Sequence, residues 1–119
     1  MDEQQFKDRT KQLALRVIRM VATLPQGYTA EVIGKQLLRS ATSIGANYRA
    51  ACRGKSTADV IAKLGIVEEE ADETIYWMEL LIDAELVSAT KMASLIAETH
   101  EIVAMTVALI KTLRRKQSS

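Results

Sequence analysis

Apolar positions repeat with the period of an α-helix in four stretches of this chain. The first stretch runs from Phe6 to Leu24 and stops at Pro25, which cannot continue helical hydrogen bonding. The last two stretches alternate steps of four and three residues, which keeps the side chains on one helical face. Their positions are Val60, Leu64, Val67, Ala71, Thr74, Met78 and Leu81, then Met92, Leu95, Thr99, Ile102, Thr106, Leu109 and Leu113. The pattern predicts helices over about 4–23, 30–53, 57–86 and 89–115.

Capping residues define the expected helix ends. We expect Thr29 to cap the second helix, and Gly54 to end it in a left-handed conformation. Ser56 opens a capping pattern before the third helix, and Ser88 precedes the fourth. Because the connections are short, successive helices are expected to be antiparallel neighbours. The sequence therefore predicts an all-α fold, an antiparallel up-down-up-down four-helix bundle in one domain over residues 1–119.

The second predicted helix carries a polar stripe where an apolar one is expected. The stripe consists of Gln36, Ser40, Ser43 and Asn47, at helical spacing on one face. On the third predicted helix, Glu70 and Glu73 share a face with apolar residues, so we expect a cationic partner, for which Arg39 is the best candidate. The spacing predicts a structural polar network between the two helices. An active site or a seam between subunits remains an alternative for the same stripe.

Composition narrows the class of protein. Nearly half of the 119 residues are hydrophobic, at 48%, while aromatic residues make up only 4%, which is typical of a helical domain. The apolar runs are short, and the first thirteen residues contain no secretory core, so we expect neither a membrane segment nor export. Cys52 is the one cysteine and is compatible with a reducing compartment. These features favour a cytoplasmic protein.

Charge is distributed unevenly along the chain. Up to Lys63 there are eleven Lys and Arg against five Asp and Glu, whereas the remainder has five against ten. Such asymmetry can guide binding to a polyanion, although solvated helix faces would show it as well. The candidate nucleic-acid contacts are Lys7, Arg9, Lys11, Arg16, Arg114, Arg115 and Lys116.

The motifs of common enzymes are missing from the sequence. Di-iron bundles need Glu-x-x-His on two helices, but the one histidine is His100 and the residue three positions before it is Ala97. No glycine-rich phosphate loop or nucleophile elbow is present. We therefore expect no cofactor, no metal, no catalytic residue and no enzymatic activity. A remote alternative is a carboxylate metal enzyme, with acids drawn from Glu70, Glu73, Glu98 and Glu101.

Two long segments of the sequence are distinctive, residues 36–51, QLLRSATSIGANYRAA, and residues 59–81, DVIAKLGIVEEEADETIYWMELL. Both segments resemble the four-helix-bundle proteins called 23S rRNA intervening-sequence proteins. The resemblance implies an antiparallel bundle that assembles into a homo-oligomer, a pentameric ring in related proteins. A related branch, the accessory variability proteins of diversity-generating retroelements, binds nucleic acid and a reverse transcriptase. The resemblance thus implies RNA or DNA binding by a basic ring surface, and it carries over no catalytic residue.

Two functions of different classes follow as hypotheses. The first is a non-catalytic, oligomeric accessory protein that binds RNA or DNA through basic surface residues. The second is a protein-protein interaction scaffold without nucleic-acid binding, which would recognise an unknown partner through exposed apolar side chains. The candidates for that surface are Leu38, Ile61, Ile75 and Tyr76.

Overall fold

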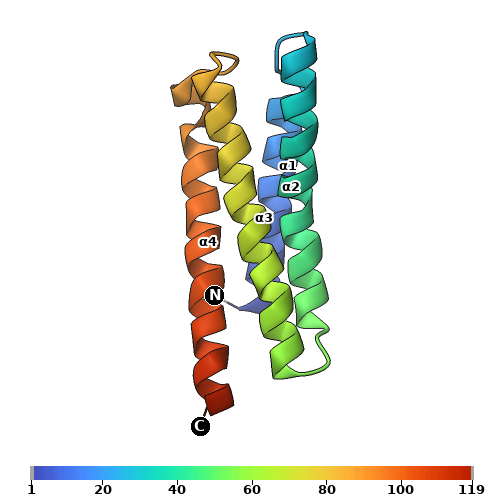
Figure 1. The fold of residues 1–119 in the computed structure, drawn as a ribbon, viewed down its shortest axis with the longest axis vertical. Coiled ribbons are helices and arrows are strands. Elements are labelled where there is room, and N and C mark those ends of the chain that lie inside the picture. Colours follow the sequence, from blue (N-terminus) through green and yellow to red (C-terminus); the bar gives the residue numbers. More distant parts are fainter. Residues whose placement is uncertain (1, 119) are drawn as a thin grey trace.

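Four antiparallel α-helices form the molecule in a computed structural model that describes residues 2–118 (Figure 1). They are α1 (Glu3–Val21), α2 (Tyr28–Cys52), α3 (Thr57–Asp83) and α4 (Ala89–Ser118). The bundle measures 52 × 21 × 20 Å. Helices that follow one another in the sequence pack side by side. Of the helix pairs that are in contact, α1 and α4 pack least extensively. The predicted four-helix bundle is therefore confirmed, and the described residues contain no strand.

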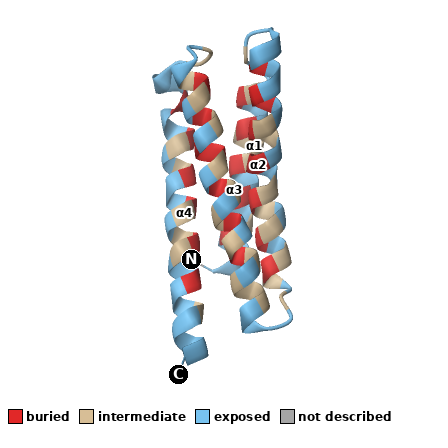
Figure 2. Ribbon diagram, in the orientation of Figure 1, coloured by how far each residue is buried: buried red, intermediate tan, exposed pale blue. Residues whose placement is uncertain are grey.

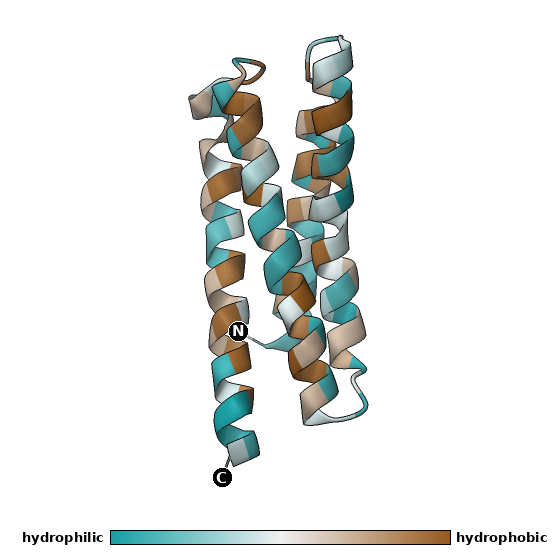
Figure 3. Ribbon diagram, viewed as in Figure 1, coloured by the Kyte–Doolittle hydropathy of each residue, from teal (hydrophilic) through white to brown (hydrophobic). Residues whose placement is uncertain are grey.

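The core runs along the inner faces of all four helices (Figure 2), and these faces also carry most of the apolar residues (Figure 3). Its largest fully buried apolar side chains are Leu13, Leu37, Ile44, Met78, Leu81, Met92 and Ile102. Four buried threonines replace apolar residues in the helical repeats, and each donates its hydroxyl to a carbonyl one turn earlier: Thr10, Thr74, Thr99 and Thr106. No buried side-chain nitrogen or oxygen within residues 2–118 lacks a hydrogen bond, so the polar core positions cost little.

Of the four expected caps, those at Ser56 and Ser88 are confirmed, and those at Thr29 and Gly54 are wrong. The Ser56 hydroxyl accepts a hydrogen bond from the Asp59 amide, and Ser88 accepts one from the Lys91 amide. The second helix begins two residues earlier than predicted, because Gly27 rather than Thr29 is its N-cap. Gly27 has a φ of 143°, a conformation that a side chain at this position would disfavour.

Helix α3 ends at Asp83, three residues before the predicted end. Glu85 adopts a left-handed φ of 61°, the Leu86 amide donates to the Leu81 carbonyl at 3.0 Å, and the Glu85 amide donates to Ile82 at 2.9 Å. These two bonds form a Schellman motif, which normally has glycine at the left-handed position. A sequence without glycine there gives no sign of this stop.

The expected left-handed cap at Gly54 is wrong, because among the described glycines only Gly27 has a positive φ. Gly54 is needed instead for close packing. A Cβ atom built on it would collide with Cγ2 of Val60 and lie 3.1 Å from the carbonyl oxygen of Ala51. The α2–α3 connection therefore folds tightly against the start of α3.

One core position in α4 also differs from the prediction. Leu109 is 37% exposed, and its neighbour Ile110 is buried at 6%. Ile110 lies eighteen residues after Met92, which is five full turns of a straight helix, so both side chains point to the buried face. Positions that repeat strictly every seven residues, such as Leu109, rotate gradually away from that face in a straight helix. By length and composition, α4 is the one described helix that could also cross a membrane. In this structure its buried face packs against the other helices.

Candidate functional site

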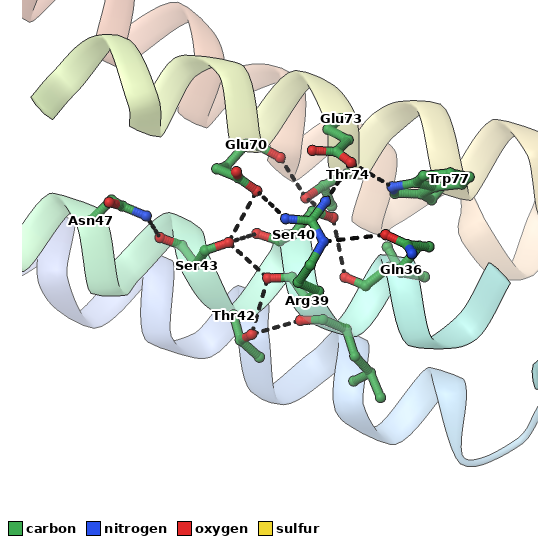
Figure 4. A network of polar contacts seen from close by, with 12 residues as sticks. Gln36, Arg39, Ser40, Thr42, Ser43, Asn47, Glu70, Glu73, Thr74 and Trp77 are labelled. Atoms are coloured by element: carbon green, nitrogen blue, oxygen red, sulfur yellow. Dashed lines mark hydrogen bonds and ion pairs between the residues drawn. The ribbon is translucent and has the colours of Figure 1, made fainter. Parts of the chain in front are cut away.

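A polar network centred on Arg39 joins α2 to α3 (Figure 4). The Arg39 guanidinium donates from Nε to Gln36 Oε1 at 3.2 Å, from Nη1 to Glu70 Oε2 at 3.2 Å, and from Nη2 to Glu73 Oε1 in a short contact. Ser43 Oγ donates to the same Glu70 oxygen at 3.0 Å. The geometry brings the predicted arginine and both predicted carboxylates together across one helix seam.

The remaining residues of the stripe extend this network in two directions. Ser40 is fully buried and shares a hydrogen bond at 2.9 Å with the hydroxyl of Thr74, which is also fully buried and was expected only as a core residue. Asn47 donates to the Ser43 carbonyl at 2.8 Å and reaches no residue of α3 among the described contacts. The middle of the stripe therefore forms hydrogen bonds across to α3, whereas Asn47 at its end bonds only to the backbone of its own helix.

Water reaches the rim of the network, although both carboxylates share a helical face with apolar residues. The Arg39 side chain is 48% exposed, and the Glu70 and Glu73 side chains are 19% and 36% exposed. Arg39 holds the pKa of Glu73 below its ordinary value through their hydrogen bond, and the Trp77 indole N–H contributes a second hydrogen bond. Both carboxylates are thus paired with the same arginine. Such a group holds two helices in register and offers no free base or acid for catalysis.

A second ion pair links α1 to α4. Arg9 donates from Nε and Nη2 to the two carboxylate oxygens of Glu98 at 2.6 and 2.7 Å, and its Nη2 lies 3.1 Å from Glu101. The four acids considered for a metal site therefore divide into two pairs, each facing its own arginine. Within residues 2–118, no group of three or more potential ligands is placed to hold a metal ion.

The seven basic candidates lie in three separate places. Lys7 and Lys11 line a groove between α1 and α2 together with Arg49. Arg9 and Arg16 lie at the α1–α4 seam instead, where Arg16 donates to Ser94 Oγ at 2.7 Å. The spacing of these residues along the helix already indicates that they cannot all share one face. Side chains two positions apart point to nearly opposite sides of a helix, so Arg9 cannot share a face with Lys7 and Lys11.

The remaining basic candidates are exposed in the last turns of α4, at the end of the bundle where the α2–α3 connection also lies (Figure 1). The exposed residues Arg53 and Lys55 of that connection were not among the sequence candidates, because they are far from α4 along the chain. We call this end the basic pole. It comprises Arg53, Lys55, Lys111, Arg114, Arg115 and Lys116.

The apolar side chains proposed for a protein partner differ widely in exposure. Ile75 is buried at 5%, so it belongs to the core and that candidate is wrong. Leu38 and Ile61 are half-buried against the core, whereas Tyr76 is 54% exposed. Ile66, on the outer side of α3, is 42% exposed. The outer side of α3 therefore carries exposed apolar groups together with the exposed acids Glu69, Asp72 and Glu79.

Comparisons with known proteins identify the family. A sequence model described as 23S rRNA-intervening sequence protein matches residues 2–108. The crystal structure of a protein with unknown function from the S23 ribosomal protein family of Bacteroides thetaiotaomicron is similar to this chain, with 39% identity and a TM-score of 0.86, over 93% of this chain and 99% of that one. No curated protein matches the chain. The chain belongs to the 23S rRNA-intervening sequence protein family.

Proposed function

We propose that this protein is a non-catalytic, self-associating accessory protein that binds the phosphate backbone of RNA or DNA through its basic pole. The observation that carries the proposal is the gathering of six cationic side chains at one end of the bundle. Among them, Arg53, Lys111 and Arg114 form no ion pair with a described carboxylate. The nearby acid Asp59 is already paired with Lys63 at 2.7 Å.

The physical reason is counterion release. Each phosphate neutralised by a lysine or arginine frees condensed cations, which makes binding strong at low salt and insensitive to sequence. A single pole is small, but a homo-oligomer with its bundles side by side would present several poles on one surface, and avidity would follow without new contacts. The names of the family and of the similar structure refer to rRNA and to a ribosomal protein family, which favours RNA as the first ligand to test.

The test is binding of fluorescent single-stranded and duplex RNA and DNA, measured by anisotropy over a series of salt concentrations. The variant Arg114→Glu/Arg115→Glu should lose about tenfold or more in affinity and show a shallower salt dependence. The matched control is Arg19→Glu/Lys91→Glu, which makes the same charge change at the opposite end of the bundle. Equal loss in both variants, or binding that does not weaken with salt, would refute the basic pole as the ligand site.

The competing function is a protein-protein scaffold. The exposure of Tyr76 and Ile66 on α3 favours it, because aromatic and large aliphatic side chains are enriched at interfaces. A pull-down after nuclease treatment that yields a stoichiometric partner, combined with no nucleic-acid binding by the purified protein, would support this function over the first.

A further inference from the structure

A groove of about 430 Å³ runs between the outer sides of α1 and α2. Its floor is made of small residues, Ala14, Gly45 and Ala46. At Gly45 the two helices come so close that an added Cβ would lie 3.1 Å from Thr10 Oγ1, so the floor is closed by direct packing. Small side chains on a closed floor let another helix approach closely.

The rim of this groove is basic. Lys7 and Lys11 come from α1 and Arg49 comes from α2. Lys11 and Arg49 are exposed and form no ion pair with any described carboxylate. The one acid in the lining, Asp8, accepts a hydrogen bond from Gln4 at 2.9 Å. The groove therefore has an apolar floor and a rim with excess positive charge.

Helix α3 presents the complementary surface on a different side of the bundle. We call it the acidic stripe. It comprises Ile66, Glu69, Asp72, Tyr76, Glu79 and Asp83, all exposed and at helical spacing. Its four carboxylates form no ion pair with a described cation, although like charges at this spacing repel one another. Tyr76 lies in the middle of the stripe and is 54% exposed.

We infer that the acidic stripe of one copy of this chain docks into the α1–α2 groove of the next copy. The carboxylates would meet the unpaired cations of the rim, and Tyr76 would cover the small-residue floor. Charge complementarity of this kind selects the partner and fixes the relative position of the two surfaces. The inference rests on the self-association proposed above and does not depend on nucleic-acid binding by the basic pole.

This interface joins two different surfaces, so it is heterologous. After two copies pair through one contact, one copy keeps an unfilled groove and the other keeps an unfilled stripe. Further copies can then add, and the assembly closes into a ring where the rotation between neighbouring copies allows it. The number of copies follows from the angle between the two surfaces.

Charge reversal tests the interface by light scattering, which measures the mass of the assembly. Lys11→Glu/Arg49→Glu reverses the groove, and Asp72→Lys/Glu79→Lys reverses the stripe. Each variant should dissociate toward the protomer mass, with an assembly midpoint raised about tenfold or more. An equimolar mixture of the two should recover a larger mass, because each reversed surface again meets its opposite charge. Circular dichroism checks that both variants keep their helices.

Controls and contrary outcomes separate the inference from the proposed function. Arg19→Glu/Lys91→Glu carries the same charge change as the groove variant and should assemble like the wild type. Wild-type protein that stays at the protomer mass at all concentrations would overturn self-association itself. An assembly that survives both reversals would keep self-association and overturn this interface. If the groove variant keeps its mass but loses RNA binding, the groove is a nucleic-acid site and the inference is wrong.

Discussion

Replacing Arg9 by methionine should destabilise the bundle, because this arginine is the main polar link between α1 and α4. It donates two hydrogen bonds to Glu98, and its Nη1 lies 3.5 Å from the sulfur of Met105. The Arg9 side chain is 26% exposed and the Glu98 side chain is 18% exposed, so water screens the pair only partly. Since α1 and α4 form the loosest helix pair, few other contacts compensate for its loss.

The expected cost follows from the geometry. A hydrogen bond to a charged group contributes about 1.5–3 kcal/mol, and an orphaned, mostly buried carboxylate adds a desolvation penalty. Partial exposure lowers the sum, so we expect about 2 kcal/mol for Arg9→Met. In a domain of this size that corresponds to a fall in Tm of about 8 °C. Glu98→Gln should cost about half as much, because the amide oxygen still accepts one hydrogen bond.

Urea unfolding of single and double variants is the assay. Arg9→Met/Glu98→Met should recover most of the stability lost in Arg9→Met, because removing both charges leaves neither one buried alone. Affinity for RNA should be unchanged in Arg9→Met, since this side chain lies outside the basic pole. A loss of stability below about 0.5 kcal/mol, the level of an ordinary surface substitution, would refute the reasoning.

Three further predictions concern local geometry and titration. Gly54→Ala should lower the free energy of unfolding by about 2 kcal/mol, measured by thermal unfolding, because the added Cβ collides with Val60. Gly54→Asn should destabilise the protein at least as much, whereas a left-handed position would tolerate asparagine. Glu85→Gly should stabilise the protein by about 1 kcal/mol, seen as a higher urea midpoint with an unchanged slope, because its φ is 61°. The pKa of Glu73 lies below 4.5, so its stabilising contribution is full above that pH and is lost as pH falls through the lowered pKa. Fluorescence of the single tryptophan, Trp77, which donates to Glu73, should follow this titration, and the change should be absent in Glu73→Gln.

The bundle could be predicted from the sequence because its core obeys a simple period. Leu64, Val67 and Met78 recur at helical spacing, so they lie on one face of α3, and that face is buried because its apolar side chains are removed from water. The helix ends were less predictable, because tertiary contacts decide them. Leu86 packs against the core, and its amide bonds back to Leu81, which forces Glu85 into a conformation that its own side chain disfavours. Nothing local in the sequence marks that strain.

The partners within the polar network could be predicted, but their exposure could not. Arg39, Glu70 and Glu73 have complementary charges at spacings that bring them to one seam. Whether water reaches that seam depends on how far each helix is rotated about its own axis, and a rotation of a few tens of degrees separates a buried pair from a half-exposed one. Only part of the basic pole could be predicted, for a different reason. The α2–α3 connection, which carries Arg53 and Lys55, reaches the same end of the bundle as the last turns of α4 only through the fold (Figure 1).

The polar network between α2 and α3 therefore accounts for the pairing of these two helices more than for an activity. Its polar groups are satisfied inside one copy of the chain, from the buried Ser40–Thr74 hydrogen bond to the Arg39 guanidinium at the surface. Charged side chains without an ion-pair partner lie elsewhere in the described residues. They are Arg53, Lys111 and Arg114 at the basic pole, Lys11 and Arg49 on the α1–α2 rim, and the four carboxylates of the acidic stripe on α3. Keeping like charges together on a helix costs free energy in the isolated protomer. In the assembly that we propose, the acidic stripe of one copy would meet the complementary groove of another copy, which would offset that cost, and the basic pole would remain exposed for a polyanion.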